Sequence, residues 1–248
     1  MFDHVTIRAS DVEASRRFYE TALAPLGVGE PYLGGHFFEW GDLSISAARD
    51  DRPLTRRVHV ALAAPSAEHV DAFWRAAIEA GFTDNGPPGL RPRYHEAYYG
   101  AFLLDPDGNN IEAVHHGRLP RSGEMIDHVS IGVGDLAASR RFYETIGPSC
   151  GFALASEHDG YLGFRGHADG PWLWLGERRA SENVHLAFRA PDNATVEEFH
   201  RLALGAGYRD NGAPGERRYH PGYFGAFVLD PDGNNVEAVC HNRRQVPG

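Results

Sequence analysis

Two histidines and one glutamate recur at matching places in the two halves of the sequence, and their types suit a metal ion. They are His4, His59 and Glu112 in the first half, and His128, His185 and Glu237 in the second. Two imidazoles and a carboxylate on one side of a metal leave its other coordination positions open for substrate, water or dioxygen. Fe(II) uses such a set for oxygen chemistry, whereas Zn(II), Mn(II) or Ni(II) would act in it as Lewis acids. We therefore expect a divalent metal ion (Fe, Zn, Mn or Ni) at these residues.

Each of these residues, taken alone, has an ordinary structural explanation. A single histidine in a strand is more often hydrogen-bonded within the fold, and a glutamate beside a turn is more often solvated. The metal interpretation gains weight because all three positions agree between the halves, although residues 27–56 differ strongly from residues 151–182. A recent duplication would produce part of this agreement, so the agreement supports the site without proving it.

The 248-residue sequence is a tandem repeat of one unit. The spacing is 124 residues from His4 to His128, 126 from His59 to His185 and 125 from Glu112 to Glu237, so the copies differ only by small insertions. We predict a first domain over residues 1–117, a Pro- and Gly-containing linker over residues 118–124 and a second domain over residues 125–242.

Each copy is built from two halves of similar layout, in which a strand with a central histidine precedes a helix and shorter strands. In the first copy, the capping pattern Ser10-Asp11-Val12-Glu13 starts a helix that runs to about Leu23, and a second helix spans roughly residues 67–80. Strands are predicted over residues 37–40, 43–47, 101–104 and 110–114, with a turn at Asp105-Pro106-Asp107-Gly108. The predicted layout is βαβββ, four times along the chain.

Strand periodicity decides which face the proposed ligands occupy. Side chains alternate between the two faces of a strand, so His4 lies opposite Val5, His59 opposite Val58 and Val60, and Glu112 opposite Ile111. Helices should cover the apolar faces. All six ligands would then project from the other face, and they converge if the sheet curls.

Composition and charge exclude several partner classes. A formal net charge of -10 argues against nucleic acid as the main partner. No apolar run is long enough to span a membrane, and the N-terminus lacks a secretion signal. Cys150 and Cys240 are the only cysteines, so no disulfide framework is expected. We expect a cytoplasmic protein that binds a small-molecule substrate; the two copies either replace a dimer or form a further homodimer.

The motifs together resemble the vicinal oxygen chelate superfamily, which includes glyoxalase I, extradiol dioxygenases, fosfomycin-resistance transferases and bleomycin-binding proteins. The resemblance rests on Asp3-His4-Val5, on Val58-His59-Val60, on residues 105–112 and on their second-copy equivalents, and it covers nearly the whole chain. It implies an α+β fold in which four βαβββ modules form two half-open barrels around metal ions held by the six residues. Family members exchange modules between barrels, so His4 joins either the ligands of its own copy or His185 and Glu237.

The resemblance is less specific for the reaction. A glyoxalase I site would add a glutamate on the last strand of the first half, but residues 43–46 read Leu-Ser-Ile-Ser and residues 172–175 read Trp-Leu-Trp-Leu. The extradiol signature fits better through His95 and His220, although Phe102 and Phe227 stand where those enzymes usually carry tyrosine. His95 and His220 are therefore candidate general acids or bases, or else surface-loop histidines. Neighbouring tyrosines would line an aromatic pocket or simply pack; they are Tyr94, Tyr98, Tyr99, Tyr219 and Tyr223.

We therefore expect a metal-dependent enzyme that acts on a small substrate with neighbouring oxygens, with dioxygenase chemistry slightly favoured over glyoxalase-type lyase chemistry. The alternative is a non-catalytic binding protein of the bleomycin-resistance type, in which Trp172 and Trp174 stack on a ligand or pack in the core. Such a protein has no need of six metal ligands. A fosfomycin transferase would need a basic cluster, and Arg91, Arg93, Arg217 and Arg218 are more typical of exposed loops.

Overall fold

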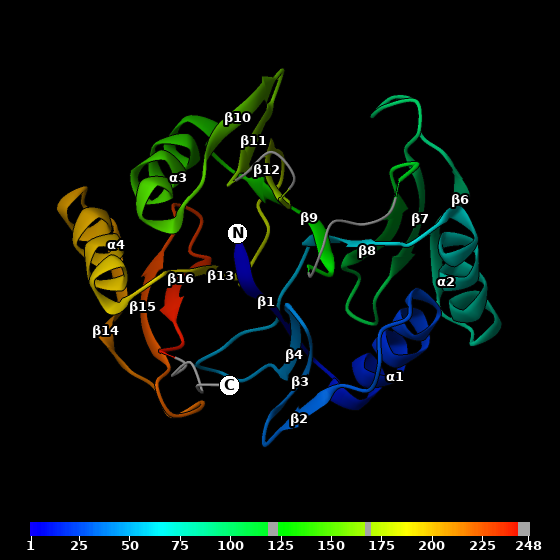
Figure 1. Ribbon diagram of the computed structural model, residues 1–248, viewed down its shortest axis with the longest axis horizontal. Helices are drawn as coiled ribbons and strands as arrows, with labels where there is room; N and C mark the ends of the chain where they lie inside the picture. Colours follow the sequence, from blue (N-terminus) through cyan, green and yellow to red (C-terminus); the bar gives the residue numbers. More distant parts are fainter. Residues whose placement is uncertain (119–123, 167–169, 243–248) are drawn as a thin grey trace, which may run out of the picture.

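The chain folds into four βαβββ modules, as the sequence predicted (Figure 1). The computed structural model describes residues 1–118, 124–166 and 170–242, so most of the predicted linker lies outside the described residues. The first module comprises β1 (Phe2–Ala9), α1 (Val12–Leu23), the short helix η1 (Ala24–Leu26), β2 (Tyr32–Gly34), β3 (Phe37–Trp40) and β4 (Leu43–Ala47). The second comprises β5 (His59–Ala63), α2 (Ala67–Glu79), β6 (Thr83–Leu90), β7 (Tyr99–Leu104) and β8 (Asn110–His115).

The second copy repeats this order. The third module comprises β9 (Ile126–Val133), α3 (Leu136–Cys150), β10 (Ala153–His158), β11 (Tyr161–Arg165) and β12 (Trp172–Glu177). The fourth comprises β13 (His185–Arg189), α4 (Asn193–Gly205), β14 (Arg209–Glu216), β15 (Phe224–Leu229) and β16 (Asn235–Cys240). None of the helices in the described ranges is long and apolar enough to cross a membrane.

The strands form two mixed sheets, and each sheet combines one module from each copy. One sheet has the order β14-β15-β16-β13-β1-β4-β3-β2, and the other has the order β10-β11-β12-β9-β5-β8-β7-β6. The two modules of the first sheet join where β1 pairs antiparallel with β13, with Val5 opposite Leu186. In the second sheet β5 pairs antiparallel with β9, with Val60 opposite Val129. The sheets therefore cross the sequence repeats.

The helices, in contrast, stay with their own copy. Figure 1 shows α1 beside α2 at one end of the molecule and α3 beside α4 at the other. Phe18 of α1 meets Phe82 edge-on at 5.1 Å between ring centroids, and Phe142 of α3 meets Tyr208 at 4.8 Å. One apolar core runs beneath both pairs, between the helices and the outer faces of the sheets. The inner faces remain available for polar side chains.

The start of α1 differs in detail from the predicted capping pattern. Asp11, and not Ser10, is the N-cap, because its carboxylate accepts hydrogen bonds from the backbone N–H groups of Glu13 and Ala14. The Ser10 hydroxyl donates instead to Asp107, in the turn before β8. The helix thus begins where predicted, and its first residues are tied to the turn that precedes Glu112.

The turn at Asp105 sets the register of the strand that carries Glu112. The Asp105 carboxylate accepts hydrogen bonds from the backbone of Asp107 and Asn109, and from the Tyr19 hydroxyl at 3.1 Å. The side-chain oxygen of Asn109 accepts the backbone N–H of Val58 at 3.2 Å. These bonds hold β8 parallel to β5, with Ala61 beside Glu112. Asp230, Asn234 and Tyr143 repeat the arrangement in the second copy.

We predict that Asn109→Ala lowers the free energy of unfolding by about 1–3 kcal/mol, the usual cost of leaving a buried polar group unsatisfied. Asn109 is fully buried, and its loss removes the acceptor for Val58 N–H. Urea unfolding measures the change. The exposed Asn85 is the control, because Asn85→Ala should change stability by less than about 0.5 kcal/mol. Equal effects of the two substitutions would contradict the role given to Asn109.

Asp42 joins the two sheets through a buried carboxylate. It is 4% exposed, and its carboxylate oxygens each lie 3.2 Å from the backbone N–H of Ile126, which donates to them. Burial raises the pKa of Asp42 from 3.8 to about 6. Because the folded state favours the protonated acid, the stability that this group contributes is fully present below pH 3.8 and is lost as the pH rises through 6.

We therefore predict that lowering the pH from 7 to 4 stabilises the wild-type protein relative to Asp42→Asn, by up to about 3 kcal/mol. The amide keeps an acceptor for Ile126 but does not titrate. Denaturant unfolding of both proteins across this pH range gives the difference directly. A free energy of unfolding of the wild type, relative to Asp42→Asn, that stays constant with pH or increases as the pH rises would contradict the raised pKa of Asp42.

Candidate metal centres

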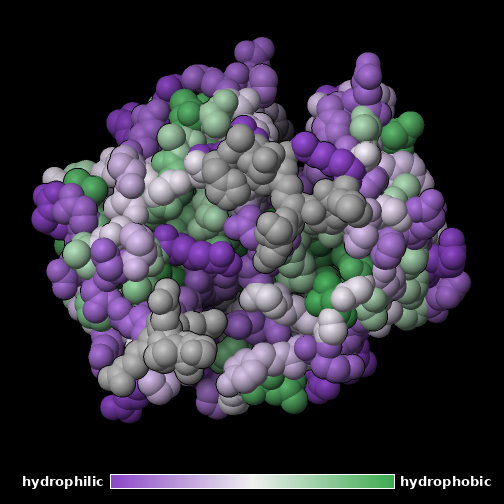
Figure 2. Space-filling model, viewed as in Figure 1, coloured by the Kyte–Doolittle hydropathy of each residue, from purple (hydrophilic) through white to green (hydrophobic). Residues whose placement is uncertain are grey.

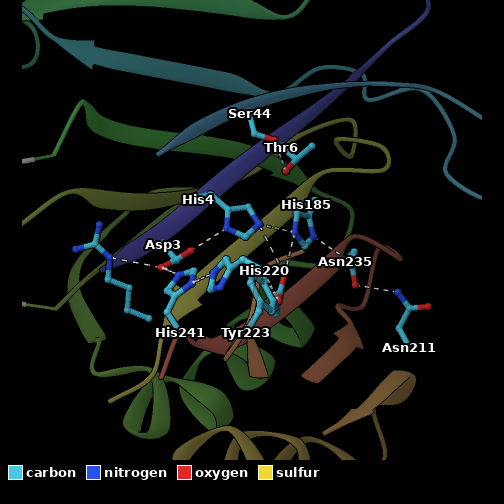
Figure 3. A network of polar contacts seen from close by, with 12 residues as sticks. Asp3, His4, Thr6, Ser44, His185, Asn211, His220, Tyr223, Asn235 and His241 are labelled. Carbon is cyan, nitrogen blue, oxygen red and sulfur yellow. Dashed lines mark hydrogen bonds and ion pairs between the residues drawn. The ribbon is translucent and has the colours of Figure 1, made fainter. Parts of the chain in front are cut away.

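The first centre consists of His4 on β1, His185 on β13 and Glu237 on β16 (Figure 3). The Nε2 atoms of the two histidines are 3.1 Å apart. Glu237 Oε2 lies 3.2 Å from His185 Nε2 and 3.8 Å from His4 Nε2. The Glu237 side chain is 1% exposed, while the imidazoles of His4 and His185 are 16% and 9% exposed. The three donor atoms therefore face one another beneath an opening that reaches solvent.

The second centre consists of His59 on β5, Glu112 on β8 and His128 on β9. The two Nε2 atoms are 3.0 Å apart, and Glu112 Oε2 lies 3.1 Å from His59 and 3.6 Å from His128. Glu112 is as buried as Glu237. The two centres thus repeat the same geometry.

The structure answers the question of module pairing that the sequence left open. His4 lies with His185 and Glu237 of the second copy, and His128 lies with His59 and Glu112 of the first. The reason is strand pairing, since β1 lies beside β13 and β9 beside β5. Neither copy alone contains a complete group of three donors.

The donor atoms of both centres fit a divalent metal ion. All three lie within 4.8 Å of one another in each centre. Two metal–ligand bonds of about 2.1 Å at right angles would place their donor atoms about 3.0 Å apart. The donor separations run from 3.0 to 3.8 Å, so a facial arrangement needs only small adjustments. Two imidazoles and one carboxylate also match the donors that Fe, Zn, Mn and Ni accept.

Carboxylates outside each centre fix the orientation of one imidazole. His4 Nδ1 lies 2.9 Å from Asp3 Oδ1, and His128 Nδ1 lies 2.8 Å from Asp127 Oδ1. When Nδ1–H donates to a carboxylate, the lone pair of Nε2 points at the donor cluster. Burial lowers the pKa of His4 and of His128, but the hydrogen bond to the neighbouring aspartate and the negative charge of the nearby carboxylates together raise it in both.

The other imidazole of each centre is held in its neutral form. Burial lowers the pKa of His185 and of His59. His185 Nδ1 lies 2.6 Å from the side-chain amide of Asn235, whereas His59 Nδ1 has no hydrogen-bond partner among the described residues. A neutral imidazole is the form that binds a metal, so these surroundings favour ligation.

A tyrosine orients the glutamate of each centre. The Tyr223 hydroxyl donates to Glu237 Oε1 at 2.6 Å, and the Tyr98 hydroxyl donates to Glu112 Oε1 at 2.7 Å. Burial and the nearby carboxylate raise the pKa of both tyrosines far above the ordinary value, so they remain donors. Each bond occupies Oε1 and leaves Oε2 facing the imidazoles.

From each centre, a series of hydrogen-bonded side chains leads outward to His220 or His95. His241 Nε2 lies 2.8 Å from Asp3, and His220 Nε2 lies 2.7 Å from His241 Nδ1. In the second centre, His116 and then His95 follow Asp127 in the same way, each step being 2.8 Å. The structure therefore places His95 and His220 at the outer ends of these chains and not against the donor atoms.

Several residues of the site were not assigned a role from the sequence. They are Asp3, Asp127, His116 and His241, which form the chains. Tyr98 and Tyr223, which the sequence offered as pocket-lining or packing residues, hold the glutamates. Their identity in both copies at a spacing of 124 or 125 residues was the available signal. It could not distinguish them from other repeated positions without knowledge of which strands pair.

The first centre opens into a cavity of about 1170 Å³. Side chains from both edges of the curled sheet line it, including Tyr32 of β2 and Asn211 of β14. Arg8, Arg52 and Arg217 line it together with the acidic Glu39 and Asp51, so the cavity carries charges of both signs. Figure 2 shows that hydrophilic residues cover most of the viewed face, with apolar residues gathered only in small areas. The cavity therefore suits a small polar ligand.

Comparison with known proteins shows similarity in sequence and in fold. The model of the Glyoxalase/Bleomycin resistance protein/Dioxygenase superfamily matches residues 1–113 and again residues 125–238. Glyoxalase I from Zea mays has a similar structure, with a TM-score of 0.67 and 20% sequence identity over 97% of this chain and 92% of that one. A candidate dioxygenase from Bacillus subtilis has a TM-score of 0.68 and 13% identity over 100% of this chain and 86% of that one. No protein of curated function matches the sequence.

Proposed function

Because the chain belongs to the glyoxalase, bleomycin resistance protein and dioxygenase superfamily, we propose that it is a metal-dependent enzyme acting on a small substrate with neighbouring oxygens. The observation that carries this proposal is the pair of complete donor sets, each buried on the protein side and open on the other. Two neighbouring substrate oxygens would complete the coordination of an ion held on one face. Fe, Zn, Mn and Ni all suit the donors.

The residues around each centre have separate tasks in this proposal. When bound, the ion supplies Lewis-acid stabilisation of negative charge on the substrate oxygens. Tyr223 and Tyr98 hold the glutamates in position, and Asp3 and Asp127 hold the imidazoles of His4 and His128. His220 lines the cavity of the first centre and lies next to His241, so it can exchange protons with a bound molecule by way of solvent.

Within this class we favour dioxygenase-type chemistry slightly over glyoxalase-type lyase chemistry. The motivating feature is the strand next to each histidine-bearing strand. β4 places Ser44 beside Thr6, and β12 places Trp174 beside Ser130, so neither strand offers the further carboxylate that a glyoxalase I site carries there. Three protein ligands leave more positions free for substrate and dioxygen.

Metal analysis of protein purified without a metal-affinity tag tests the proposal. Wild-type protein should hold about two metal ions per chain, one in each centre, and His59→Ala combined with His185→Ala should hold none. Iron would then support dioxygen chemistry, and zinc or nickel would support lyase-type chemistry. A wild-type protein that takes up no Fe, Mn, Ni or Zn on reconstitution would refute the proposal. It would favour the alternative of a non-catalytic protein that binds a small molecule.

A further inference from the structure

The two centres share their donors but differ in the wall beside them. Strand β4 lies parallel to β1 in the first centre, and β12 lies parallel to β9 in the second. The register makes Ser44 and Trp174 equivalent, because Ser44 lies beside Thr6 and Trp174 beside Ser130. Trp172 lies beside the ligand His128 itself. The inner wall is therefore hydroxylated in the first centre and made of indole rings in the second.

The indole rings of the second centre form an ordered, partly exposed surface. Trp172 and Trp174 stack with ring centroids 4.8 Å apart and planes 15° apart. The guanidinium of Arg165 lies 4.2 Å from the ring centroid of Trp172 and supports it from β11. Trp174 lies close over Gly163, where a Cβ atom would approach its ring to 2.5 Å. The glycine thus makes room for an indole that β4 does not carry.

Each centre also has an arginine beside its donor set, supplied from a different strand in each case. In the first centre, Arg8 follows His4 and Thr6 on the inner face of β1 and lines the cavity. In the second centre Gly132 takes the place of Arg8, and Arg178, at the end of β12, donates to Ser130 Oγ at 3.0 Å. A Cβ at Gly132 would lie 2.3 Å from the backbone oxygen of Arg179 and 3.0 Å from Arg178 Cγ, so the glycine makes room for the segment that carries Arg178.

Both centres therefore have a positive charge, although Arg8 and Arg178 occupy positions that are not equivalent in the two copies. The residue equivalent to Arg178 in the first copy is Ala48, since Ser46 lies beside Arg8 as Gly176 lies beside Gly132. Inheritance from one duplicated unit does not account for an arginine that changes strand. A requirement for a cation beside each donor set does, and a carboxylate is the group that a guanidinium binds in two-pronged fashion.

We propose that the second centre selects an aromatic carboxylate with a neighbouring oxygen, whose ring lies against Trp174 and whose carboxylate lies between the donor set and Arg178. The first centre, with Ser44 in place of Trp174, lacks this indole surface. The inference rests on the proposed function, because the donor set must hold the ion that the ligand chelates.

Calorimetric titration of Zn²⁺-loaded protein with 2-hydroxybenzoate and with lactate tests the inference. Both probes carry a carboxylate and a neighbouring oxygen, and only 2-hydroxybenzoate carries a ring. His185→Ala protein presents the second centre alone, and His59→Ala protein presents the first. The affinity for 2-hydroxybenzoate divided by that for lactate should be about tenfold higher in the second centre, because ring stacking adds about that much binding. Comparing this ratio between the centres cancels the intrinsic chelating strength of the probes.

Two substitutions in the His185→Ala protein identify the residues responsible. Trp174→Ser should reduce the affinity ratio to that of the first centre, whereas Trp174→Phe should retain most of it. Arg178→Ala, at an exposed residue that the fold does not need, should weaken both probes about tenfold and leave the ratio unchanged.

Equal affinity ratios in the two centres, or a ratio that survives Trp174→Ser, would overturn the inference. So would unchanged affinities in Arg178→Ala. Metal content, measured in the same samples, separates the two proposals. Metal-loaded protein without the ring preference refutes this inference alone, and protein that binds no metal refutes the proposed function together with it.

Discussion

Replacement of Glu237 by glutamine is expected to lower the Zn²⁺ affinity of the first centre by more than about 100-fold, since even partners outside the coordination sphere change metal affinity 10–100-fold. Glu237 is the only carboxylate among the three donors, and its Oε2 lies within 3.8 Å of both imidazoles. The amide removes the negative charge and presents at most a weak oxygen ligand. The second centre, with its own Glu112, should keep its affinity.

Competition with a chromophoric chelator measures both affinities in one titration. Glutamine keeps an oxygen that can accept the hydrogen bond from Tyr223, so the substitution should leave the fold intact. Glu112→Gln is the matched variant, and it should weaken the second centre alone. If Glu237→Gln binds two ions as tightly as the wild type, Glu237 is not a metal ligand.

Saturation with Zn²⁺ is expected to raise the melting temperature by about 10 °C or more. At a free metal concentration 100 times the dissociation constant, each centre adds about 2.7 kcal/mol. In a chain of this size, 1 kcal/mol corresponds to about 2–4 °C. The ion would join strands from both copies, β1 to β13 and β16 in the first centre, so it stabilises the pairing on which each sheet depends.

Scanning calorimetry at fixed protein concentration, with Zn²⁺ or with EDTA, gives this shift. His59→Ala retains one centre, so about half the increase should remain, and His59→Ala combined with His185→Ala should show none. An equal shift in the double variant would show that the ion acts elsewhere on the chain.

The sequence predicted the elements and faces well because both follow from short-range periodicity. His4 was placed on the face opposite Val5, and the structure buries Val5 in the core while His4 faces the donor cluster. The strands β3 and β4 have the predicted bounds. The turn at Asp105 was also predicted, because its residue types specify a turn on their own.

The strand β6 could not be predicted in the same way. It contains Pro87 and Pro88, which in a sequence indicate a loop, and its register shifts around Gly86. The structure accommodates it because β6 is the edge strand of its sheet, where a missing backbone N–H leaves no neighbour unsatisfied. Edge position is a property of the whole sheet and is not encoded locally.

The grouping of His4 with His185 could not be predicted from the local sequence pattern for the same reason. Both within-copy and cross-copy groupings place these side chains on inner faces, and the two differ only in whether β1 pairs with β13 or with β5. The hydrogen-bonded chain from His4 through Asp3 to His241 depends on that pairing as well, since His241 lies 238 residues from Asp3 in the sequence. Nothing in the residues near His4 indicates it.

The structure groups the candidate ligands of each centre from both copies, and the metal content of His4→Ala combined with Glu237→Ala tests this grouping most directly. These residues belong to one centre in the structure but to different copies in the sequence. After reconstitution with Zn²⁺, we expect about one ion per chain in this double variant, and none in His4→Ala combined with Glu112→Ala. Loss of both ions from the first variant, with one ion retained by the second, would show that ligands group within each copy and would contradict the account.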